Sequence, residues 1–241
     1  MRMKIFGKYG KMNNSAELPY EITPLFPLPL YKTNIGREFT EQEQDEFDTI
    51  IEKNVDQKSP EYATRQSIDK YVLERKPLLT IKSFLEHHLK QFTNNILGIT
   101  DPNISCSITQ SWLNVTIPQQ YFFPHHHSNS IISGVFYPKC LKYPDDRLDE
   151  IIFNKNENTS MFQFFEIPGQ KPTPFSAPNF ICPLVTGDLV LFPSNIKHSV
   201  PTNNTNQNRI SLAFNTFFFG ALGTYEDTSE LIFKQGSHEY K

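Results

Sequence analysis

The chain has 241 residues, with 26 acidic and 23 basic side chains and a formal net charge of −3. The basic residues are spread along the chain, which argues against a nucleic-acid-binding protein. No run of about 18 apolar residues is present to span a membrane, and the first residues lack the apolar stretch of a signal peptide. The 21 phenylalanines and 18 prolines instead favour one domain built largely from short aromatic strands and turns.

The cysteines carry information about the compartment. Cys106, Cys140 and Cys182 are far apart, odd in number and form no CxxC pair. We therefore expect free thiols in a reducing environment, and hence a soluble cytoplasmic protein.

Two helices are predicted in the first hundred residues, after a loose polar segment over residues 1–24 and an extended, proline-containing stretch over 25–32. Thr40 and Glu43 form a capping box that should open a helix running to about residue 54. Apolar residues at helical spacing predict a second helix over 76–96. His87 and His88 lie on that helix about 100° apart and are not expected to chelate a metal.

From residue 104 onward, short apolar segments alternate with turns through to about 219, which indicates a β-sandwich or barrel. Residues 139–178 include a polar, proline-rich excursion that we expect to overhang a site. Residues 222–241 give no signal and are treated as a tail. The expected strands are 105–115, 121–127, 131–138, 150–153, 161–167, 179–185, 188–193, 198–201 and 209–219.

The histidines are the most informative side chains. Only seven are present, and His125, His126 and His127 are consecutive. Residues i and i+2 of a strand share a face, so strand parity leaves two choices of ligand: the 125/127 pair or His126 alone. His198 follows an apolar strand 71 residues after His127 and can supply a third imidazole. Three ligands on one face of an octahedron, with the other positions open, are typical of mononuclear iron oxygenases.

A carboxylate-binding pocket is expected beside these histidines. Arg209 begins a strand eleven residues after His198, beyond a polar turn, and Ser211 lies on the same strand face as Arg209. A guanidinium in this place suits bidentate binding of a carboxylate. By parity, Tyr137 shares the face of His125. Asn114 on the preceding strand is a candidate to hold the end of the bound ligand that lies nearest the metal. Trp112 is expected to lie in the core.

These motifs, in this order and spacing, resemble the 2-oxoglutarate/Fe(II)-dependent dioxygenase superfamily, its prolyl-hydroxylase-like branch, and in particular a group of oxygenases from bacteria and phages. The resemblance covers about residues 25–219. The matching segments are Leu25 to Tyr31, Trp112 with Asn114, His125 to Ser130, Ser133 to Tyr137, Gly187 to His198, and Arg209 with Ser211.

The resemblance implies a double-stranded β-helix (jelly roll) with N-terminal helices packed on one sheet, forming a single domain over 25–221. It places His125 and His127 at the HxD positions, with His replacing Asp, and His198 at the distal histidine. It implies that Arg209 and Tyr137 bind the distal carboxylate of 2-oxoglutarate. The expected reaction uses Fe(II), 2-oxoglutarate and O2 to hydroxylate a substrate, with release of succinate and CO2.

Three other functions remain open at this stage. One is a non-enzymatic jelly-roll protein that keeps the metal for structure. A second is a three-histidine dioxygenase that does not use 2-oxoglutarate, against which Arg209 and Ser211 argue. The third, a halogenase, requires a non-ligand at the carboxylate position and therefore a shifted register. The substrate and the oligomeric state are not indicated by the sequence.

Overall fold

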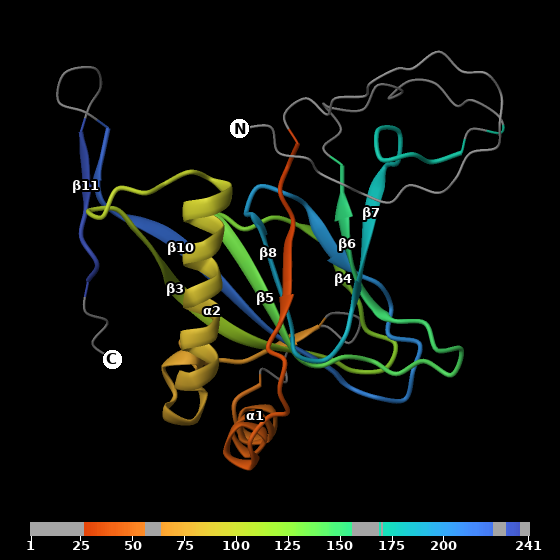
Figure 1. Cartoon of the computed structure of the whole chain (residues 1–241). Helices are drawn as coiled ribbons and strands as arrows, with labels where there is room; N and C mark the ends of the chain where they lie inside the picture. The colour runs from red at the N-terminus through yellow and green to blue at the C-terminus, as the bar shows by residue number, and fades with distance from the viewer. Residues whose placement is uncertain (1–26, 56–63, 156–168, 170, 224–229, 237–241) are drawn as a thin grey trace.

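Two antiparallel sheets packed face to face, with helices on the outside of one of them, make up the computed structural model (Figure 1), which describes residues 27–55, 64–155, 169, 171–223 and 230–236. The larger sheet has seven strands in the order β1-β8-β5-β10-β3-β2, with β11 pairing β10. Its strands are β1 Tyr31–Asn34, β2 Arg65–Gln66, β3 Ser105–Thr116, β5 Ile132–Lys139, β8 Asp188–Pro193, β10 Arg209–Leu222 and β11 Leu231–Phe233.

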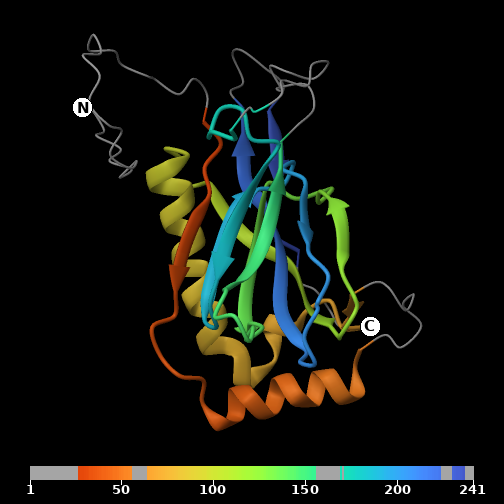
Figure 2. The same ribbon diagram turned by 90° about the vertical axis from the view of Figure 1, so that its right-hand side faces the viewer.

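The smaller sheet has four strands in the order β4-β9-β6-β7. These strands are β4 Phe122–His125, β6 Asp149–Asn154, β7 Asn179–Leu184 and β9 His198–Val200. The two sheets form a double-stranded β-helix, as predicted. In the view of Figure 2, α2 lies along one side of the larger sheet and α1 runs beneath it.

The two faces of strand β10 contact different layers of the fold. Ile210, Leu212 and Phe214 belong to the core between the larger sheet and the helices. The alternate residues Arg209 and Ser211 line a cavity between the two sheets. The period-two pattern predicted these two faces correctly.

The helices lie where the sequence predicted them, but the second predicted helix is not one regular α-helix. Helix α1 (Glu41–Lys53) begins after Thr40, and both hydrogen bonds of the capping box are present. The predicted helix over 76–96 is divided into a 3₁₀ turn, Lys76–Leu78, helix α2, Leu79–Gln91, and a π turn, Phe92–Ile96. A further 3₁₀ turn spans Val72–Glu74.

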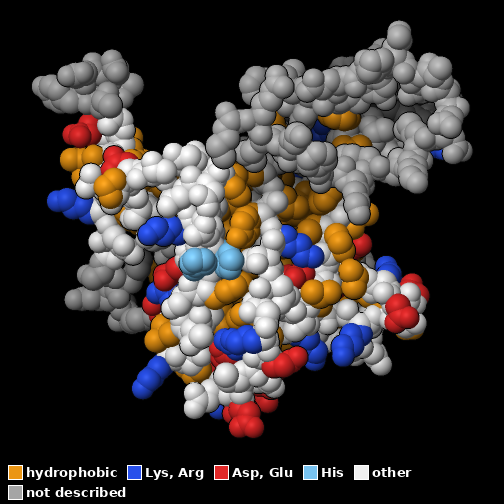
Figure 3. Space-filling view, viewed as in Figure 1, with side chains coloured by type: hydrophobic (Ala, Val, Ile, Leu, Met, Phe, Trp, Pro, Cys, Tyr) orange, Lys and Arg blue, Asp and Glu red, His pale blue; other side chains and the backbone are white. Residues whose placement is uncertain are grey.

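Neither histidine of α2 belongs to a metal-binding group among the described residues, as the helical geometry indicated, and His88 has a structural role. The ring Nδ1 of His88 and the hydroxyl of Tyr31 lie 2.6 Å apart and share a hydrogen bond that ties α2 to strand β1. His87 is exposed. The face over α2 carries acidic and basic side chains interspersed, without a continuous patch of either sign (Figure 3).

The predicted strands match the observed ones closely, with a few differences. The extended stretch predicted over 25–32 becomes strand β1 at Tyr31–Asn34, on the edge of the sheet. Strands β2 and β11 were not predicted, because two or three residues are too short for a pattern to emerge. The strand predicted over 161–167 and the polar segment over 1–24 lie outside the described residues.

The cysteines are free thiols, as expected, and Cys140 and Cys182 are buried between the sheets. Burial raises the pKa of the Cys106 thiol to about 11, so this group stays protonated at neutral pH. None of the helices in the described ranges is long and apolar enough to cross a membrane.

Gly134 in β5 offers a test of the core packing. A Cβ built on Gly134 would lie 2.0 Å from Cζ of Phe214, whose ring is fully buried. Gly134→Ala is therefore expected to lower the free energy of unfolding by about 1–3 kcal/mol through overpacking. Chemical denaturation measures this, with Gly236→Ala as the control because nothing lies within 4 Å of its Cβ position. Equal midpoints for the two variants would contradict the prediction.

Candidate active site

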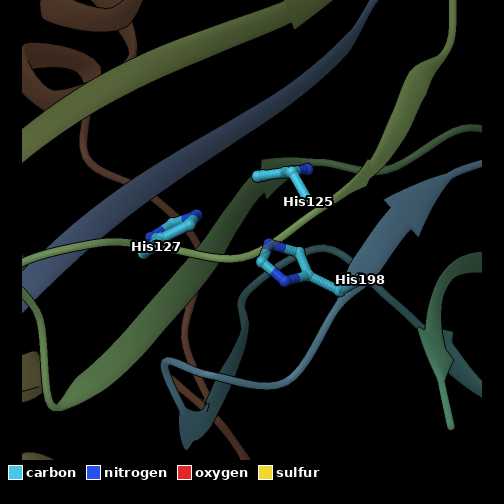
Figure 4. A group of neighbouring side chains, drawn as sticks. All are labelled: His125, His127 and His198. Carbon is cyan, nitrogen blue, oxygen red and sulfur yellow. The ribbon is translucent and has the colours of Figure 1, made fainter. Parts of the chain in front are cut away.

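Three histidine rings meet at one end of the space between the sheets. His125 ends strand β4 and is the register partner of His198 on β9, with ring centroids 4.3 Å apart. The ring of His127 lies 5.3 Å from that of His125 and 5.1 Å from that of His198. One nitrogen from each ring can be chosen so that all three lie within 4.8 Å of one another (Figure 4).

His127 joins this group from beyond the end of strand β4, whereas strand parity predicted that it would lie on that strand. Strand β4 stops at His125, so the strand predicted to reach residue 127 is two residues too long. The backbone N–H of His127 instead donates to the carbonyl of Ser194, at 3.1 Å. The rings of His125 and His127 are nearly parallel, with an interplanar angle of 21°. His126 between them is exposed and lies outside the group.

Backbone carbonyls hold two of the rings by their Nδ1 atoms. The Nδ1 of His125 lies 2.9 Å from the carbonyl of Phe123, and that of His198 lies 3.1 Å from the carbonyl of Ile196. A carbonyl only accepts, so each Nδ1 carries the proton and donates. The Nε2 lone pair of each ring is then free for a metal, an arrangement usual for histidine ligands.

The His127 ring is held by side chains rather than by backbone. Its Nδ1–H donates to Oδ1 of Asn215, at 2.6 Å, and approaches Oγ of Ser133, at 3.1 Å. The Ser133 hydroxyl itself donates to Ser194, which donates to Ser130. Because the Ser133 hydroxyl proton is donated to Ser194, the Ser133 oxygen is left to accept a hydrogen bond from His127. The sequence analysis did not identify Asn215 as a partner of His127.

Asn215 provides a test of this outer hydrogen bond. Asn215→Ala is expected to weaken metal binding by about 10- to 100-fold, because the His127 ring loses its closest acceptor and its fixed tautomer. Competition with a chromophoric chelator, using Zn(II) as the probe, measures the affinity. Asn215→Asp keeps an acceptor at this position and is the matched control, expected to retain wild-type affinity or better. If the alanine variant bound Zn(II) as tightly as wild type, the hydrogen bond would have no part in holding the ligand.

Burial keeps the three imidazoles neutral. Loss of solvent is the largest effect on each ring and lowers the pKa of His125 to about 4 and that of His198 to about 3. It also lowers the pKa of His127. Neutral rings offer lone pairs to a metal at neutral pH without first losing a proton. Because they carry no charge, a divalent ion held by them keeps its full double positive charge.

A cavity of about 50 Å³ extends from the histidines into the space between the sheets. Asn114 and Ser211 are register partners on β3 and β10, and both line it. Trp112 lines it too, with its ring 5.6 Å from that of His127, so the expectation that this side chain lies in the core is wrong. A larger cavity of about 450 Å³, between α2, β3 and the segment near residue 235, includes none of the histidines.

Arg209 lies in the wall of the smaller cavity and is only 2% exposed. Its Nε donates to Oδ2 of Asp149 at 2.9 Å, and its Nη2 to the carbonyl of Glu150 at 3.4 Å. Its Nη1 has no hydrogen-bond partner among the described residues. Burial is the largest single effect and tends to lower the pKa of Arg209, but Asp149, Tyr137 and Cys140 together raise it, so the guanidinium is charged. The pairing with Asp149 was not predicted from the sequence.

Tyr137 lines the same cavity and is fully buried. Its hydroxyl has no hydrogen-bond partner among the described residues, and the guanidinium carbon of Arg209 lies 5.0 Å from the centre of its ring. Burial raises the pKa of Tyr137, so the phenol keeps its proton and remains a donor. A buried donor without an acceptor costs free energy. Tyr137 and Arg209 thus offer unmatched donors to an oxygen-bearing ligand.

Comparison with known proteins agrees with this arrangement. Residues 110–215 match the family model described as "Putative 2OG-Fe(II) oxygenase". This segment contains all three histidines and also Tyr137, Asp149 and Arg209. No curated protein matches the chain.

Solved structures share the fold at low sequence identity. The epimerase SnoN from nogalamycin biosynthesis, in complex with Fe3+, alpha-ketoglutarate and nogalamycin RO, is 11% identical and covers 87% of this chain and 92% of its own, with a TM-score of 0.56. The carbocyclase SnoK is 11% identical over 87% of this chain and 90% of its own, with a TM-score of 0.54. HygX from Streptomyces hygroscopicus, with nickel and 2-oxoglutarate bound, is 10% identical over 78% and 82%, with a TM-score of 0.50.

Proposed function

We propose that this chain is a 2-oxoglutarate/Fe(II) oxygenase that binds iron through His125, His127 and His198 and hydroxylates a C–H bond of its substrate. The family match and the fold support this proposal. The observation that carries the proposal is the convergence of these three rings, each with Nδ1 held by an oxygen atom, at the end of a buried cavity. Imidazole nitrogens in this number suit Fe(II) and leave coordination positions open.

The donors at the far end of the cavity suit a carboxylate of the co-substrate. A carboxylate there would accept from Nη1 of Arg209 and from the hydroxyl of Tyr137, the two donors left unmatched. Ser211 and Asn114, which also line the cavity, would add polar contacts to 2-oxoglutarate between its two ends. These features favour a 2-oxoglutarate-dependent enzyme over a three-histidine dioxygenase or a purely structural metal site, neither of which needs a buried arginine in this place.

The protein residues have three tasks in the reaction. The histidines fix the metal, Arg209 and Tyr137 orient the co-substrate by its distal carboxylate, and the apolar walls between the sheets exclude water. When bound, Fe(II) and 2-oxoglutarate together supply the oxidising chemistry, in which O2 is consumed, succinate and CO2 are released and one oxygen atom enters the substrate.

An anaerobic titration tests the proposal directly. Adding Fe(II) and then 2-oxoglutarate should produce a visible charge-transfer band, because a 2-oxo acid chelates the metal, and admitting O2 should then yield succinate. Succinate in place of 2-oxoglutarate is the matched control, since it lacks the chelating keto acid and should give no band. A protein that binds Fe(II) but gives neither band nor succinate formation would be a metal-binding jelly roll and not this class of oxygenase.

A further inference from the structure

The ion pair between Arg209 and Asp149 is the most deeply buried in the described part of the chain, with side chains 2% and 1% exposed. Asp149 also accepts hydrogen bonds from the backbone N–H groups of Leu141, at 3.1 Å, and Glu150, at 2.8 Å. Three donors on its two oxygens fit an ionised carboxylate. A negative charge is therefore built into the wall behind the arginine, which the resemblance to oxygenases did not predict.

Asp149 shares one sheet face with the metal end of the site. In strand β6, Phe153 is the register partner of His198, and Asp149 lies four residues earlier with the same alternating burial. Four residues of strand span about 13 Å, so the carboxylate and the histidines occupy opposite ends of one enclosed layer. Charges within such a layer are poorly screened and affect one another.

The charges of the loaded site balance only if Asp149 is included. A divalent metal on three neutral histidines contributes +2, Arg209 contributes +1, Asp149 contributes −1 and 2-oxoglutarate contributes −2, which sums to zero. In a site with two histidines and one carboxylate on the metal, that carboxylate would supply the −1. Here the residue at that position, His127, is an imidazole, which binds a metal through a neutral nitrogen lone pair. The negative charge lies instead on Asp149, the partner of Arg209.

We propose that Asp149 is a positioning residue that takes over, through its ion pair with Arg209, the charge-balancing role of the carboxylate absent from the metal. The inference rests on the proposed function, since it concerns binding of 2-oxoglutarate. Arg209 lies between two anions when the co-substrate is bound, and Asp149 competes with the distal carboxylate for its charge. Asp149 thereby holds Arg209 buried and oriented in the empty site and limits the affinity for the dianion.

Three variants test the charge relation: Asp149→Asn, His127→Asp and the double variant. The dissociation constant of 2-oxoglutarate is measured by titration calorimetry with saturating Ni(II) as the redox-inert metal. Asp149→Asn leaves one positive charge in excess and should bind 2-oxoglutarate about tenfold more tightly or better. His127→Asp adds a negative charge and should bind it about tenfold more weakly. The double variant should return to near the wild-type value.

Thermal melting supplies a second readout, which separates an electrostatic effect on ligand binding from a general loss of stability. Without ligand, Asp149→Asn should melt below wild type, because a buried arginine has lost its partner, and 2-oxoglutarate should raise its melting temperature by more than in wild type. Asp188→Asn is the matched control: it neutralises another buried carboxylate, whose ion-pair partner is Lys32 rather than Arg209. It should lower stability and leave the affinity for 2-oxoglutarate unchanged.

The outcomes are decisive in either direction. Weaker binding in Asp149→Asn, or a double variant no better than His127→Asp alone, would overturn the charge-balancing role. If Asp149→Asn does not fold, His127→Asp decides the question, because its Arg209–Asp149 pair is intact: equal or tighter binding of 2-oxoglutarate overturns the proposal. A wild-type protein that binds Ni(II) but no 2-oxoglutarate would instead contradict the proposed function itself.

Discussion

Replacing His125, His127 or His198 with alanine is expected to lower metal affinity by more than about 100-fold, whereas His126→Ala should retain the metal. Each substitution removes one of the three imidazoles whose nitrogens converge within 4.8 Å in the described part of the chain. Loss of a ligand should exceed the 10- to 100-fold cost of losing an outer hydrogen-bond partner. His126 is the matched control because it is adjacent, of the same type and exposed. Anaerobic Fe(II) titration, followed by elemental analysis, measures the effect.

The reverse pattern would identify an error in the site. If His126→Ala lost the metal while His127→Ala kept it, the assignment of ligands would be wrong by one residue. Since divalent affinities generally rise from Fe(II) towards Ni(II) and Cu(II), a purified sample can carry the wrong ion. Protein produced in iron-supplemented medium and analysed for several metals controls for this.

Strand periodicity accounts for most of what the sequence predicted correctly. In β10, one parity places Arg209 and Ser211 at the cavity and the other places Leu212 and Phe214 in the core. The capping box at Thr40 located the start of α1 to the residue. These features depend on local rules, since the side chains of a strand alternate and a helix start needs an acceptor for its free N–H groups.

Pairings between distant segments could not be predicted in the same way. Asp149 and Arg209 are 60 residues apart, and His127 and Asn215 are 88 apart. Parity gives the face of a strand but not which residue of another strand lies opposite, because that depends on the sheet register. The prediction that Trp112 lies in the core was wrong for a related reason. A large apolar side chain on an inward face can line a cavity as well as fill a core.

Arg209→Ala is expected to retain metal and lose 2-oxoglutarate binding. Removing one partner of a desolvated charge pair costs roughly 2–5 kcal/mol, which corresponds to about 30- to several-thousand-fold in affinity. Arg209→Lys should recover part of the loss, because an ammonium keeps the charge but cannot form the fork of a guanidinium. Titration calorimetry with 2-oxoglutarate, in the presence of an inert metal, measures both. Ser211→Ala should lose less, on the order of 1 kcal/mol for one hydrogen bond.

The Arg209→Ala variant needs a control for its effect on Asp149, whose buried carboxylate is left unpaired. The double variant Arg209→Ala/Asp149→Asn removes both charges, so it should regain stability in thermal melting yet still fail to bind 2-oxoglutarate. Tyr137→Phe removes the unmatched hydroxyl without changing any charge and should weaken binding by a smaller factor. Unchanged 2-oxoglutarate affinity in a folded Arg209→Ala protein would show that the co-substrate does not reach this end of the cavity. It would also remove the main physical reason for preferring a 2-oxoglutarate-dependent enzyme over a three-histidine dioxygenase.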